Sequence, residues 1–111
     1  MISYNEIYEV LRKEKYSETL QPLPKEFIDG FSLYLNEKKE DSSREGDLFM
    51  DNVVKSKKQL ENSISLFKEL MRLRKRKLLN LVFVATETGI MKRDYENMLV
   101  FERETFDQLV R

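Results

Sequence analysis

The longest regular pattern of apolar positions lies in the second half of the chain. Seven residues there are separated by steps of four and three, with one position skipped: Leu60, Ile64, Phe67, Met71, Leu78, Leu81 and Ala85. This spacing is typical of a helix that packs against other helices. Arg74 is the residue that interrupts the seam. Because no Gly or Pro occurs between Asp47 and Thr88, the sequence predicts one helix over about 47–88, roughly 60 Å long.

A second apolar line runs beside this seam over the C-terminal half of the long helix. It comprises Leu66, Leu70, Leu73, Leu79, Val82 and Phe83. A helix that is apolar on most sides must be covered on most sides, and three shorter helices are too few to cover this one. We therefore expect the 60–85 seam to face the chain's own core and the second line to be shared with another chain. The predicted subunit interface comprises Leu66, Leu70, Leu73, Leu79 and Phe83.

The first part of the chain predicts two shorter helices. A capping box opens the first helix, which is expected over about 3–16, with Glu14 among its outward-facing residues. The passage Gln21-Pro22-Leu23-Pro24 favours an extended linker, because a residue that precedes proline is pushed out of the helical region. Its last proline suits the first position of a helix, so a second helix is predicted over about 24–37.

The remaining segments complete the predicted fold. Residues 38–47 contain no aliphatic or aromatic side chain and are predicted to form a loop. Gly89 is expected to terminate the long helix. A fourth helix is predicted over about 92–109, and Glu102 is the only mismatch on its apolar face. The sequence thus predicts an all-α, four-helix bundle-like domain built on one very long helix.

Composition and charge restrict the function classes. The chain has 20 basic and 20 acidic residues, so its formal net charge of zero gives no global argument for binding nucleic acid or an anionic membrane. It contains no Cys and no His, which removes the thiol nucleophile, the imidazole base and the usual transition-metal ligands. We predict no catalytic residue, no cofactor and no metal site. No apolar run is long enough to cross a bilayer, and a cytoplasmic protein is expected.

A basic run allows two interpretations. It comprises Arg72, Arg74, Lys75, Arg76 and Lys77. Clustered cations are typical of a surface that contacts nucleic acid or another partner. Alternatively, an antiparallel fourth helix would place Glu102 and Glu104 opposite this run, so that charges are matched within the chain. We favour charge matching, or a variant of it in which the run faces a protein partner, over contact with nucleic acid.

The order of these passages resembles a known family. A tyrosine-bearing first helix ends in Leu11-Arg12-Lys13-Glu14 and is followed by Leu20-Gln21-Pro22-Leu23-Pro24. Inside the long helix stands Leu73-Arg74-Lys75-Arg76-Lys77-Leu78-Leu79. Together these passages resemble the helical domain of archaeal GINS proteins, of the class that places this domain first. Members of that class usually continue into a small β-rich domain, whereas this sequence stops at Arg111, so we expect a single helical domain over 1–111 that is either a fragment of a longer protein or a short member of the family.

The resemblance implies a non-enzymatic structural subunit in DNA replication. It implies packing with other GINS subunits in a homo- or heterotetramer, and contacts with the MCM helicase and a Cdc45/RecJ-like partner. The expected location is then the cytoplasm, at the nucleoid during replication. The alternative is an independent nucleic-acid-binding helical bundle that uses residues 72–77. A generic coiled-coil adaptor is a third interpretation, but it leaves the two prolines without a role.

Overall fold

The computed structural model describes residues 2–42 and 50–111, which form five helices and no strand. The helices are α1 (Tyr4–Lys15), α2 (Phe27–Ser42), α3 (Met50–Glu87), α4 (Lys92–Glu96) and α5 (Val100–Val110). The predicted all-α fold is confirmed. Within these ranges, every helix is too short or too polar to span a membrane.

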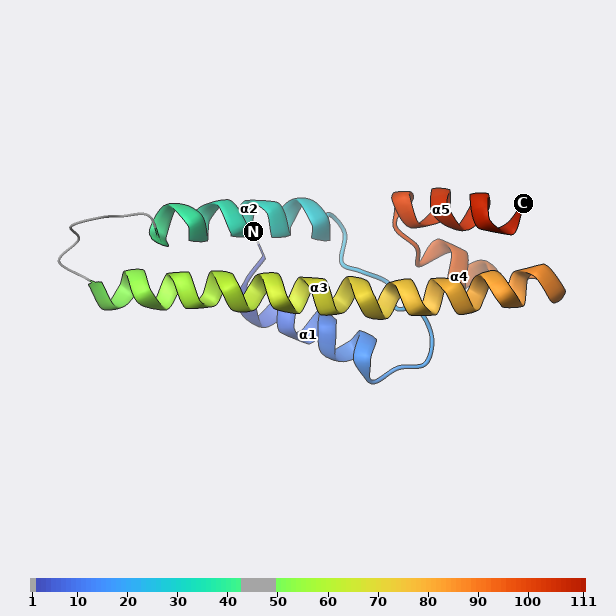
Figure 1. Cartoon of the computed structure of the whole chain (residues 1–111), viewed down its shortest axis with the longest axis horizontal. Helices are drawn as coiled ribbons and strands as arrows, with labels where there is room; N and C mark the ends of the chain where they lie inside the picture. The colour runs from blue at the N-terminus through green and yellow to red at the C-terminus, as the bar shows by residue number, and fades with distance from the viewer. Residues whose placement is uncertain (1, 43–49) are drawn as a thin grey trace.

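Helix α3 is the axis of the molecule. It is continuous over 38 residues, and the molecule measures 61 × 24 × 19 Å. In Figure 1, α2 and α5 lie along one side of α3 and α1 lies along the other. The predicted end at Thr88 is one residue beyond the observed end, and Gly89 follows with a left-handed φ of 78°. The predicted start at Asp47 lies outside the described residues.

Helix α2 begins and ends later than predicted. Pro24 is not in the helix, because its carbonyl accepts a hydrogen bond from the Phe27 N–H in a turn that precedes α2. Glu26 in that turn has a positive φ of 60°. Residues 38–42, predicted as loop, continue the helix to Ser42. Lys and Glu are good helix formers, and here their propensity extends α2 without apolar support. The rest of the predicted loop, 43–47, lies outside the described residues.

The apolar seam of α3 serves two separate cores. The N-terminal core lies between α1, α2 and the middle of α3, and its buried residues are Ile2, Ile7, Leu11, Phe27, Phe31, Tyr34 and Leu70. The rings of Phe31 and Phe67 stack there with centroids 4.3 Å apart. The C-terminal core holds Leu20, Met98 and Phe106, against which Leu78, Leu81 and Ala85 of α3 pack. The inward direction of the seam is therefore confirmed, and residues 74–77 lie between its two halves.

The predicted fourth helix is two helices. Residues 97–99 break it, so that α4 ends at Glu96 and α5 begins at Val100. Neither Gly nor Pro marks this break. Its cause is tertiary and lies in the charged residues between the two cores.

Candidate functional site

Arg74 occupies the centre of a buried charge cluster. Its side chain is 0% exposed, yet each of its five N–H donors has an acceptor. Nε and one Nη2 donor bind the two carboxylate oxygens of Glu102 at 3.0 and 2.8 Å. Nη1 binds Glu14 at 2.7 Å and the carbonyl of Gln21 at 2.7 Å. The remaining Nη2 donor binds the carbonyl of Asn97 at 2.8 Å.

Lys77 completes the cluster one turn further along α3. Its ammonium donates to the second carboxylate oxygen of Glu14 and to the Glu14 carbonyl, both at 2.6 Å. It also donates to the Thr19 carbonyl at 3.0 Å and to Ser17 Oγ at 3.2 Å. The cluster therefore contains two cations and two carboxylates, and their formal charges cancel. Among the described side chains, no buried polar atom lacks a hydrogen-bond partner, which is the condition under which buried charge is tolerated.

The cluster explains the break between α4 and α5. The Glu102 oxygen that accepts from Arg74 Nη2 also accepts the Leu99 N–H at 2.8 Å and so caps the first turn of α5. The Asn97 carbonyl is turned to Arg74, and its side-chain amide donates to the Leu20 carbonyl at 3.0 Å. A continuous helix would direct the Asn97 carbonyl along its own axis. The acceptors that Arg74 needs are thus provided by ending one helix and starting another.

The sequence-based interpretation of the basic run is confirmed in part. Arg74 meets Glu102, as charge matching with the antiparallel C-terminal segment predicts. The assignment of Glu14 to an outward face is wrong, because this residue is 0% exposed. The sequence does contain a signal for the burial of Glu14. This residue follows Ile7 and Leu11 at steps of four and three and so continues the buried face of α1.

Burial also changes the predicted contact residues. Arg74 cannot reach a partner or nucleic acid, and Lys77 is bound within the cluster with 13% of its side chain exposed. Both are therefore removed from the predicted contact set. Arg72 is exposed but bonds Glu69 through two guanidinium nitrogens at 2.6 and 3.0 Å, which holds the pKa of Glu69 below its ordinary value. Lys75 and Arg76 are exposed.

The predicted subunit interface divides into two parts. Leu70 is 1% exposed in the chain's own core, so its assignment to a subunit contact is wrong. Leu66 and Leu73 are partly buried against the same core, because α1 and α2 together cover more of α3 than expected. Leu79 is 42% exposed and Phe83 is 71% exposed. The part of the interface that is open to a partner therefore lies near the C-terminal end of α3.

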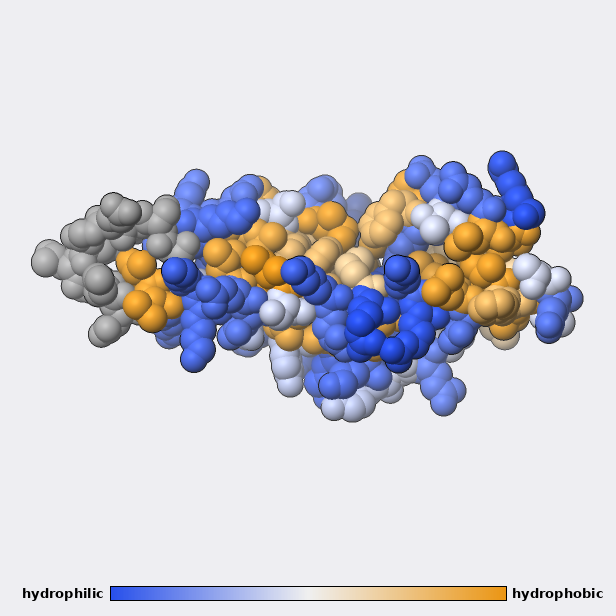
Figure 2. Space-filling view, viewed as in Figure 1, coloured by the Kyte–Doolittle hydropathy of each residue, from blue (hydrophilic) through white to orange (hydrophobic). Residues whose placement is uncertain are grey.

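Several other large apolar residues are exposed around this end of the molecule. They are Val84, Met91, Val100, Phe101 and Leu109. Figure 2 shows apolar residues gathered over α5 and the C-terminal end of α3, on the face turned to the viewer. The C-terminal core is small, and it leaves apolar surface on both α3 and α5. An exposed apolar surface of this kind is typical of a site for protein–protein contact.

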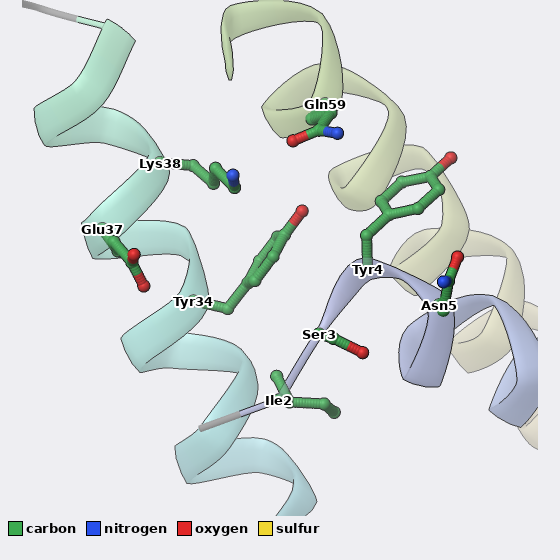
Figure 3. Close-up of a pocket in the computed structure, with 8 residues that line it drawn as sticks. All are labelled: Ile2, Ser3, Tyr4, Asn5, Tyr34, Glu37, Lys38 and Gln59. Carbon is green, nitrogen blue, oxygen red and sulfur yellow. The ribbon is translucent and has the colours of Figure 1, made fainter. Parts of the chain in front are cut away.

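A polar pocket lies at the opposite half of the molecule (Figure 3). It has a volume of about 520 Å³ and is lined by Ile2, Ser3, Tyr4, Asn5, Tyr34, Glu37, Lys38 and Gln59. Tyr34 points across it toward α3, and its hydroxyl accepts a hydrogen bond of 3.1 Å from Ser63. The Lys38 amine lies 5.7 Å from the centre of the Tyr34 ring. This pocket contains no nucleophile paired with a base, and in the described part of the chain no acidic cluster could hold a metal ion.

The five tyrosines of the chain differ in their exposure. Tyr34 is buried, and Tyr4 and Tyr95 pack partly buried against the two cores. Tyr8 and Tyr16 of the N-terminal segment are exposed. Comparisons of the chain with protein-family models, with curated proteins and with solved structures find no match.

Proposed function

We propose that this chain is a non-enzymatic assembly subunit of the GINS type, whose α3 helix packs against another subunit of a replication complex. The observation that carries the proposal is the exposure of Leu79 and Phe83 on a continuous helix whose opposite side is already packed. Burying such apolar surface between subunits is favourable at roughly 25 cal/mol per Å².

The charge cluster joins the three passages of sequence on which the family resemblance rests. Three passages carry that resemblance, and each places a residue in the cluster: Glu14 from the first, Gln21 from the second and Arg74 from the third. Passages that are distant in the sequence therefore meet at one point of the fold. This convergence supports the proposal because a joint of this kind constrains all three passages together.

The wider partners belong to the same proposal. As a GINS-type subunit, the chain would pack with other GINS subunits and help to join the MCM helicase to a Cdc45/RecJ-like protein. The chain would act by positioning its partners. The charge cluster holds α1, α3 and α5 in place relative to one another, and α3 exposes apolar residues near its C-terminal end. No chemical step is assigned to the chain.

Nucleic-acid binding is the weaker candidate. Of the five cations in the basic run, Arg74 and Lys77 are neutralised inside the cluster and Arg72 is paired with Glu69. Lys75 and Arg76 remain as exposed cations without a salt bridge to a described residue. Two such contacts predict weak affinity that falls with rising salt and is lost in a Lys75→Ala, Arg76→Ala variant.

Light scattering of the chain with and without a candidate GINS partner subunit tests the proposal. We expect a complex with the wild-type chain and none with Phe83→Asp. Tyr8→Asp is the matched control, because Tyr8 is also an exposed aromatic but lies on α1, beside the N-terminal core and away from the exposed end of α3. A chain that stays monomeric and binds no other replication subunit would contradict the proposal.

A further inference from the structure

We infer that the exposed side of α3 near its C-terminal end binds a second copy of this chain, with the two α3 helices antiparallel. This inference rests on the proposed function and deepens it by naming the occupant of the exposed surface. It is carried by the order of charge along one stripe of the helix.

The outward stripe of α3 consists of Arg72, Arg76, Leu79, Phe83 and Glu87. Steps of four, three, four and four residues keep these side chains on one side of a helix with 3.6 residues per turn. All five are exposed, and they point away from the side that carries Leu70 and Arg74. The stripe is therefore cationic at one end, apolar in the middle and anionic at the other end.

That order is complementary to itself when the helix direction is reversed. A two-fold axis through the midpoint of Leu79 and Phe83 places Leu79 of each copy against Phe83 of the other. The same operation brings Arg76 of each copy beside Glu87 of the other. Every contact in such an interface occurs twice, because two-fold symmetry makes the two surfaces identical. In a parallel pair, by contrast, Arg76 would meet Arg76 and Glu87 would meet Glu87, which is repulsive.

The charges at the two ends of the stripe are available for this role. Neither Arg76 nor Glu87 forms a salt bridge with another residue in the part of the chain that the structure describes. Helices α1, α2 and α5 pack against other sides of α3, so a second α3 can approach the stripe without displacing them. The stripe covers 16 residues, about 24 Å of helix. An interface of this length is below the standard size, so we expect a dimer that dissociates on dilution.

A charge-swap experiment tests the antiparallel pairing. Arg76→Glu and Glu87→Arg are made separately, and self-association of each is measured by sedimentation equilibrium. Each variant places like charges together twice in its own dimer, so we expect at least tenfold weaker self-association than in the wild type. In an equimolar mixture, however, both contacts again join opposite charges. We therefore expect the two variants to associate with each other about as strongly as the wild type associates with itself.

The inference would be overturned if both single variants self-associated as strongly as the wild type, or if mixing them did not restore association. Circular dichroism verifies that the variants are folded, which is expected because both positions are exposed. Absence of self-association in the wild type at millimolar concentration would also overturn it. The proposed function would survive that result if the chain still bound a different subunit and Phe83→Asp abolished the binding, so the two failures are distinguishable.

Discussion

Arg74 and Glu102, each the one charged residue in an otherwise apolar helix seam, form a two-point ion pair with N–O distances of 3.0 and 2.8 Å. The pair joins the middle of α3 to the first turn of α5. Glu14 occupies the equivalent seam position of α1 and binds the same guanidinium at 2.7 Å. Three departures from the apolar pattern are therefore one feature of the structure, a charge cluster placed between the two cores.

Removing the cation from the cluster should destabilise the fold strongly. Arg74→Met leaves two buried carboxylates short of partners, and breaking a buried ion pair from one side costs about 3–5 kcal/mol. Arg72→Met is the matched control on the same helix, because the Arg72–Glu69 pair is exposed and its loss should cost about 0–1 kcal/mol. Urea unfolding measures both. Equal stability of the two variants would show that the cluster does not hold the fold together.

Lysine should not replace arginine in the cluster. Arg74 binds four separate groups through a planar fork, and an ammonium offers three donors from a single point. We expect Arg74→Lys to lose at least about 2 kcal/mol of unfolding free energy, since acceptors are left unsatisfied. Arg72→Lys should be nearly neutral in the same denaturation assay. A wild-type midpoint for Arg74→Lys would mean that only the charge matters at this position.

Loss of the carboxylate at position 102 should release the C-terminal segment before the rest. Glu102→Gln loses the ion pair to Arg74 and weakens the cap on the Leu99 N–H. Hydrogen exchange followed by mass spectrometry should show faster exchange in α4 and α5 than in α1 and α2, because the latter lie in the other core. Glu104→Gln, at an exposed position of α5, serves as the control. Uniform acceleration along the whole chain would argue against two separable cores.

Substitutions of Phe106 and Phe83 should distinguish a side chain that stabilises the fold from one that mediates association. Phe106 is buried in the core, so Phe106→Ala should cost about 3–5 kcal/mol of unfolding free energy. Phe83 is exposed, so Phe83→Ser should change monomer stability by no more than about 0.5 kcal/mol. Thermal unfolding at low protein concentration measures both. A large loss of stability in Phe83→Ser would assign that side chain to the fold instead of to a partner.

The alkaline titration of Tyr95 should report its contact with Asp107. The Tyr95 hydroxyl donates to the Asp107 carboxylate at 2.9 Å, and this hydrogen bond raises the pKa of the phenol above its ordinary value. The folded state therefore holds the phenol proton more tightly than the unfolded chain does. Its contribution to stability is fully present below the ordinary tyrosine pKa and is lost as the pH rises through the raised value. In an ultraviolet titration, Asp107→Asn should move the Tyr95 transition to lower pH, and an unchanged transition would contradict the assignment.

Sequence periodicity was sufficient to predict the rod and the direction of its seam. The steps from Leu60 to Ala85 and the terminal Gly89 contain that information locally. Periodicity also marked the positions of the charge cluster, since Arg74 and Glu102 were both identified as mismatches. The same spacing also places Glu14 on the buried face of α1, but it was assigned outward because a glutamate near the end of a short helix is usually exposed.

The break between α4 and α5, and the extent to which other helices cover α3, could be learned only from the tertiary structure. The gap between α4 and α5 arises because Asn97 and Glu102 serve a guanidinium from another helix, and no local propensity records that demand. Leu70 was assigned to a partner because the area that α1 and α2 cover depends on how they pack around α3. Phe83 is exposed because α1 and α2 pack against earlier turns of α3 and α5 packs on another side, and its assignment to a subunit contact stays a prediction.

The central claim is that the chain's own helices cover the middle of α3, whereas the exposed surface near its C-terminal end packs against another chain. Sedimentation equilibrium of the wild type and Phe83→Ser over a wide concentration range tests it most directly. We predict that the wild-type mass rises above the monomer value of 13.4 kDa with concentration and that the Phe83→Ser mass does not. A wild-type chain that remains at 13.4 kDa throughout, both alone and with a candidate partner subunit, would contradict the account.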